Sequence, residues 1–175
     1  AGRGDGTFGP EDPVTGSAAA KMFLCALGYK ADLEGLVGND WELNTNILAN
    51  QDAGLYDGLS GLDASAGLSR DNTAQMAYNA VQAQEVYYDN LTGDHSNVLQ
   101  TFTKGTMLTN RFDVVKVEGI AVANDVFGIN GNTATQAGKM RLEGTSYTDT
   151  EGNVHKGYYD GNYTVALDND LVGQC

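Results

Sequence analysis

The stretch Gly4-Asp5-Gly6-Thr7-Phe8-Gly9-Pro10, followed by Val14-Thr15 and an apolar, alanine-rich segment, decides how this chain is expected to fold. A loop of glycine, aspartate and proline suits tight turns, and Thr15 stands where the N-cap of a helix is expected. The same arrangement returns 54 residues later, as the loop 58–62 and then Leu68-Ser69 before a second apolar segment. Two copies in register indicate an internal repeat.

The two apolar segments correspond residue by residue. The matched positions are Ala20, Met22, Ala26 and Leu27 in the first copy and Ala74, Met76, Ala80 and Val81 in the second. Their spacing is that of one helix face, so we expect both helices to bury the same stripe. Cys25 falls within the first segment and is expected to be a buried thiol.

A third helix is predicted between the copies, over residues 41–53. Trp41 and Leu48 are seven residues apart on one face, and Gly54 suits the position after the last helical turn. The repeating unit is then a helix, a Gly/Asp loop and a capped helix, with the second copy at about 32–86. The first copy lacks its opening helix, so we expect the chain to start after a missing N-terminal part.

These motifs resemble the S-layer homology repeat of bacterial cell-surface proteins. The segment 4–10 is similar to the end of that family's loop, and Leu68-Ser69-Arg70-Asp71 is similar to its helix-opening motif. The resemblance covers roughly residues 1–85. It implies a non-catalytic, extracellular protein held on the bacterial cell wall, because such repeats dock onto secondary wall polysaccharides.

The resemblance also implies which residues meet the glycan. They are Arg70, Ser69, Asp71, Trp41, Asp5, Gly6 and Thr7. Arg70 matches the family's arginine, which helps to hold an acidic group of the glycan, and a guanidinium grips a carboxylate with two charge-assisted hydrogen bonds. The first copy carries Gly16 at that position, so its groove would lack the charged group.

The second half of the chain has a different character. Residues 87–105 are polar and rich in turn formers, and we expect a linker there. Residues 112–123 alternate as a strand does, with a bulge or bend at Gly119. Two further strands are expected at 139–142 and 158–167, with a turn at 149–153. The predicted fold is therefore α+β, with helical repeats over 1–86 and a small β-rich barrel or sheet over 106–175.

The charge of the chain narrows its partners. The formal net charge of −13 repels nucleic acid and anionic lipid. There is also no run of 18 apolar residues, so we expect no membrane insertion. No cofactor is expected. Acidic and amide side chains cluster at 149–153 and 168–170. We interpret both clusters as solvated turns, and a calcium site stays open as the alternative.

Catalysis requires convergent groups, and none can be assembled from this sequence. His95 and His155 lie in polar stretches without ligand spacing, so no enzymatic activity is predicted. Two alternatives to wall anchoring stay open. The first is a subunit that polymerises with itself into a surface layer or filament, which the missing arginine at Gly16 and the unclosed β-rich part favour. The second is the anchor part of a larger extracellular enzyme.

Overall fold

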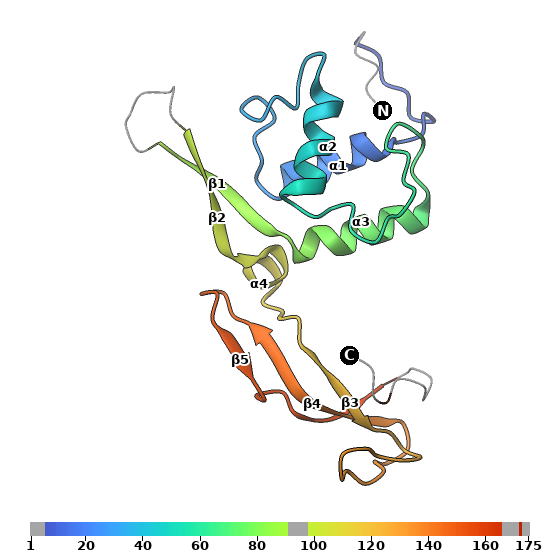
Figure 1. The fold of residues 1–175 in the computed structure, drawn as a ribbon. Helices are drawn as coiled ribbons and strands as arrows, with labels where there is room; N and C mark the ends of the chain where they lie inside the picture. The colour runs from blue at the N-terminus through green and yellow to red at the C-terminus, as the bar shows by residue number, and fades with distance from the viewer. Residues whose placement is uncertain (1–5, 91–97, 166–171, 173–175) are drawn as a thin grey trace. The chain divides into compact units, whose positions relative to one another are not determined.

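The computed structural model describes residues 6–90, 98–165 and 172 (Figure 1). Its described part is mixed helix and sheet, which confirms the α+β class at that level. The chain divides into two compact units, residues 1–107 and 108–175. The first contains α1 (Gly16–Ala26), α2 (Trp41–Gln51), α3 (Arg70–Gln82), β1 (Gln84–Asn90) and β2 (Val98–Thr106), and the short α4 (Met107–Phe112) follows at the division.

The predicted helix starts are confirmed. Thr15 caps α1 by accepting a hydrogen bond from the Ala18 N–H at 3.2 Å, and Ser69 caps α3 by accepting one from the Asn72 N–H at 3.1 Å. The two caps share one backbone conformation, with φ/ψ of −75/161° at Thr15 and −72/160° at Ser69. Each cap is worth about 1 kcal/mol of helix stability.

The two helix starts lie side by side. Thr15 and Gly67 form an antiparallel β-bridge, and the Leu68 N–H donates to the Val14 carbonyl at 2.8 Å. The residues before α3 therefore also fix the entrance to α1.

The core of the first unit is made by both copies, but they bury different faces. The fully buried side chains include Leu24 of α1 and Met76 of α3. Met22, which matches Met76, is 58% exposed, and Cys25 is exposed as well. The predictions of one shared buried stripe and of a buried thiol are wrong, because α1 packs on α2 more extensively than on α3, so the two matched helices have different surroundings.

The stretch expected as a linker instead contains most of an antiparallel hairpin, β1 and β2. The hairpin packs on the helices, since the Val86 N–H donates to the Leu27 carbonyl at 2.9 Å. Gly28, at φ +104°, permits this contact, because a Cβ there would lie 2.1 Å from the Val86 oxygen. Met107 also packs on this core, so the first unit extends to that residue.

The second unit is an antiparallel sheet centred on β4 (Lys139–Thr148). On one side of β4 lies β3 (Glu118–Ala123), and on the other lie β5 (Val154–Lys156) and β6 (Gly161–Thr164), one after the other. The register of β3 shifts between Glu118 and Ile120, which confirms the bulge expected at Gly119.

The strand boundaries differ from those expected. The first strand begins only at Glu118, the one expected at 139–142 runs on to Thr148, and the last is described over 161–164. The small core of the second unit is formed by Ala121, Val122, Ala123 and Met140. None of the helices within the described ranges is long and apolar enough to cross a membrane.

Candidate functional site

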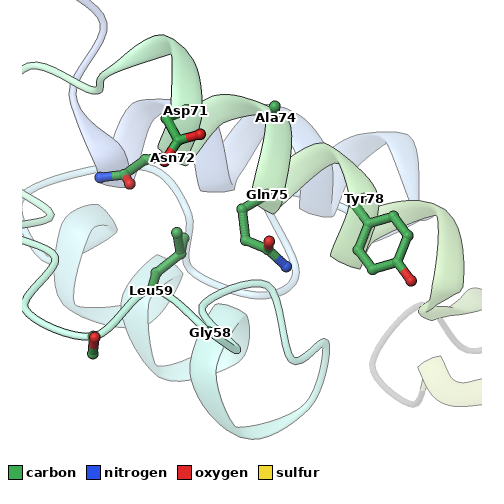
Figure 2. Close-up of a pocket in the computed structure, with 8 residues that line it drawn as sticks. Gly58, Leu59, Asp71, Asn72, Ala74, Gln75 and Tyr78 are labelled. Atoms are coloured by element: carbon green, nitrogen blue, oxygen red, sulfur yellow. The ribbon is translucent and has the colours of Figure 1, made fainter. Parts of the chain in front are cut away.

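A pocket of about 330 Å³ lies between α3 and the loop that follows α2. Figure 2 shows Asp71 and Asn72 towards one end of this stretch of α3 and Tyr78 towards the other, with Gly58 and Leu59 on the facing loop. The lining residues are Gly58, Leu59, Ser60, Asp71, Asn72, Ala74, Gln75 and Tyr78.

Helical spacing places the polar lining residues on one face of α3. Asp71, Gln75 and Tyr78 follow at intervals of four and three residues, which brings their side chains into one row. On the loop side, Gly58 has φ +76°, a conformation that favours glycine. A turn closed by the Leu59 N–H and the Tyr56 carbonyl at 3.0 Å then directs the chain along the pocket.

Asn79 fixes the two walls of the pocket to each other. Its Nδ2 donates to the Leu55 carbonyl at 3.0 Å and to the Asp57 carbonyl at 2.8 Å. Its Oδ1 accepts from the Gln75 Nε2 at 2.9 Å, so the amide of Gln75 is held in place. The pocket thus has preformed walls, as small-molecule sites usually do.

The charge in the pocket is acidic. Asp71 is the only Asp or Glu among the lining residues, and no Lys, Arg or His lines it. Arg70 is exposed at the start of α3 and does not line the pocket. Tyr78 is 54% exposed, so part of its ring is open to a ligand.

The structure brings some of the predicted contact residues together and leaves others apart. Ser69, Arg70 and Asp71 are consecutive at the start of α3, and Asp71 lines the pocket. Trp41, at the start of α2, is half-buried with the Lys21 Nζ 5.2 Å from its ring centroid, and it does not line the pocket.

The predicted loop contacts also lie outside the pocket lining. Gly6 and Thr7 are exposed, and Asp5 falls outside the described residues. The sequence did not point to Asn72, Ala74, Gln75 or Tyr78 as lining residues. The signal that identifies Ala74, Gln75 and Tyr78 is their spacing of three, four and seven residues from Asp71, which places them on one face of α3.

The corresponding place on α1 is filled. Gly16 stands where α3 has Arg70, and a Cβ on Gly16 would lie 2.9 Å from the Ala64 Cα. Ser17, which matches Asp71, is buried and donates from its N–H to the Ala64 carbonyl at 2.8 Å. Leu24, which matches Tyr78, is fully buried. The loop before α3 therefore closes the first copy's equivalent of the pocket.

A second polar cluster lies in the turn between β4 and β5. Asp149 accepts hydrogen bonds from the backbone N–H groups of Glu151 (2.9 Å) and Asn153 (2.8 Å), and its Oδ2 lies 2.7 Å from the His155 Nε2. The His155 ring stacks on Tyr147 with centroids 4.8 Å apart. These contacts confirm the predicted turn at 149–153. They also show that the Asp149 carboxylate is occupied by hydrogen bonds within the turn.

The calcium alternative finds no ligand set in the described ranges. Across residues 6–90 and 98–165, no group of three or more His, Cys, Asp or Glu side chains is placed to hold a metal ion. The other candidate stretch, 168–170, and His95 fall outside the described residues.

Comparison with known proteins identifies no relative. No protein-family model matches the chain, and no curated protein or solved structure does either. The chemistry of the pocket and the repeat around it are the basis for a functional proposal.

Proposed function

We propose that this chain is a non-catalytic bacterial cell-surface protein, held on the cell wall by secondary polysaccharide bound beside α3. The observation that carries the proposal is the position of the pocket. It lies against the helix opened by Ser69, Arg70 and Asp71, the residues that resemble the helix-opening motif of S-layer homology repeats.

The chemistry of the lining supports a sugar ligand. A carboxylate, two amides and a hydroxyl offer hydrogen-bond partners for sugar hydroxyls, from Asp71, Asn72, Gln75 and Ser60. Tyr78 adds an aromatic ring that packs well against the C–H face of a sugar. Arg70, the exposed residue before Asp71, suits an acidic substituent on the same glycan.

The two copies are expected to differ in binding. The first copy's equivalent of the pocket is closed by Ala64, so the proposal assigns one glycan site to the helical unit. The chain carries a net charge of −13 and repels acidic polymers. The polysaccharide is therefore expected to carry few negative charges, or to carry them away from Asp71.

The test is a pull-down with purified bacterial sacculi, before and after removal of the secondary polysaccharide. We expect binding to intact sacculi, loss of binding after stripping, and several-fold weaker binding for Arg70→Ala. Lys156→Ala is the matched control, because it removes one positive charge from an exposed side chain of the second unit. Equal binding to stripped and intact sacculi would overturn the proposal.

A second candidate, a self-assembling surface subunit, is favoured by exposed apolar side chains on the helical unit. Leu33, Val37, Leu43 and Ile47 are between 41% and 61% exposed, and burying such apolar side chains in a contact between copies of the chain would be favourable. Sedimentation velocity over a range of concentrations tests it. Leu43→Glu with Ile47→Glu should abolish oligomers, whereas Val154→Glu, at a 63% exposed position of the second unit, should not.

A further inference from the structure

The pocket beside α3 carries information on the kind of sugar it would hold, and this inference rests on the proposed function. Its eight lining residues include one carboxylate, that of Asp71, and no cationic side chain. An acidic sugar placed there would lose its hydration shell next to a like charge, which is unfavourable. A carboxylate instead accepts hydrogen bonds readily from neighbouring hydroxyls or from an ammonium group.

The walls limit the size of the ligand. A volume of about 330 Å³ lies near the lower end of the range of small-molecule sites, about 300–1,000 Å³. Ala74 stands on α3 between the polar end at Asp71 and the ring of Tyr78, and its small side chain leaves the space between them open (Figure 2). A short saccharide therefore fits this space better than a branched polymer does.

The positions of the charges separate two parts of the ligand. Asp71 lines the pocket, whereas Arg70, one residue earlier, is exposed and outside the lining. An acidic substituent is therefore expected to meet Arg70 outside the pocket, while the interior meets a different part of the glycan.

We propose that the pocket binds a non-acidic sugar unit, a hexose or an amino sugar, with Asp71 accepting hydrogen bonds from its hydroxyl or amino groups and Tyr78 packed against its ring. Gln75, held by Asn79, orients the unit through its amide. Any carboxylate on the polysaccharide lies outside the pocket, next to Arg70. The site is thus selective for the uncharged or amine-bearing part of the repeat unit.

The sign of the effect of Asp71→Asn tests the inference. The probe is wall polysaccharide released from sacculi, used untreated and after chemical reduction of its carboxyl groups to alcohols, with binding measured by titration calorimetry. We expect Asp71→Asn to weaken binding of both forms about tenfold, since one charge-assisted hydrogen bond is worth about 1.4 kcal/mol or more. Ala74→Leu, which fills the space at an exposed position, should weaken both forms as well.

Arg70→Ala serves as the matched variant outside the pocket. In the unchanged protein, carboxyl reduction should weaken binding only by the Arg70 contribution, and in Arg70→Ala the two forms should bind equally. Tighter binding of untreated polysaccharide by Asp71→Asn, or full binding by Ala74→Leu, would overturn the inference and leave wall anchoring in place. Absence of binding to untreated polysaccharide by the unchanged protein would remove both the inference and the proposed function.

Discussion

The hydroxyl of Tyr88 donates a 2.6 Å hydrogen bond to the Glu34 Oε1, which joins β1 to the segment between α1 and α2. The Tyr88 hydroxyl oxygen also accepts a hydrogen bond from the Lys30 N–H at 3.2 Å, and the Lys30 Nζ lies 5.2 Å from the centre of the Tyr88 ring. One side chain thus holds the hairpin on the helical unit by three contacts.

Removing the Tyr88 hydroxyl should loosen this attachment. We expect Tyr88→Phe to lower the free energy of unfolding by about 1 kcal/mol, because a hydrogen bond to a carboxylate is lost. Urea denaturation measures the change. Tyr87→Phe is the control, since Tyr87 is 50% exposed, and an equal loss in both variants would contradict the role of Tyr88.

The stability of the helical unit should fall at alkaline pH. Burial raises the pKa of Tyr56 to about 12. It raises the pKa of Tyr88 further, with the Glu34 hydrogen bond as the next cause. The folded-state pKa values exceed the unfolded value of about 10. The two neutral tyrosines therefore stabilise the fold fully below about pH 10, and this stabilisation is lost as the pH rises towards about 12. Urea midpoints from pH 8 to 11.5 should show this decline, with a shallower slope in Tyr56→Phe.

The turn between β4 and β5 should weaken in acid. Hydrogen bonds from His155 and from the Asn153 N–H hold the pKa of Asp149 well below its ordinary value. A depressed carboxyl pKa stabilises the fold above the unfolded value of about 4, and this stabilisation is lost as the pH falls below it. The amide signals of Glu151 and Asn153, followed by NMR from pH 5 to 2, should report the loss.

Two variants separate this effect from general acid unfolding. Asp149→Asn should remove the acid-dependent change at those two amides, because it carries no titrating carboxyl. Glu151→Gln should retain it, since the exposed Glu151 side chain does not organise the turn. An unchanged pH dependence in Asp149→Asn would show that another group controls the turn.

The two helix caps should contribute independently of packing. Thr15→Ala and Ser69→Ala are each expected to cost about 1 kcal/mol in unfolding free energy, because an N–H at each helix start loses its acceptor. Ser69→Asp should preserve stability, since a carboxylate also caps. If Ser69→Asp were as unstable as Ser69→Ala, the cap would not be the cause.

Gly16 should tolerate no side chain. Gly16→Ala would place a Cβ 2.9 Å from the Ala64 Cα, and we expect a loss of about 1–3 kcal/mol from overpacking. Gly161→Ala is the control, because nothing lies within 4 Å of a Cβ there, and its effect should stay within about 0.5 kcal/mol. For the same reason, Gly16→Arg is expected to disrupt the unit and not to create a second glycan site.

Local chemistry explains what the sequence predicted well. A hydroxyl three residues before an unsatisfied N–H caps a helix wherever the helix lies, so Thr15 and Ser69 were identifiable from their neighbours alone. The bulge at Gly119 and the turn at Asp149 depend in the same way on short-range geometry.

Long-range contacts explain what the sequence left out. The burial of Met76 and the exposure of its match Met22 depend on which helices pack around each copy, and the repeat pattern does not contain that information. The sequence predicts a linker where the hairpin lies, because the attachment of the hairpin depends on partners such as Leu27 and Glu34, far away in the chain. Of the predicted contact residues, Asp71 lines the pocket, whose other wall is the distant loop at Gly58–Ser60.

The contact between the two helix starts also orders events during synthesis. Thr15 bridges Gly67, and Gly16 and Ser17 donate to the carbonyls of Ala66 and Ala64, so the entrance to α1 is completed by residues translated roughly 50 positions later. At about 5–20 residues per second, several seconds pass before that partner emerges from the ribosome. During this interval α1 can pack only on segments already translated, such as α2, and the backbone hydrogen bonds at its entrance form only when the loop before α3 arrives.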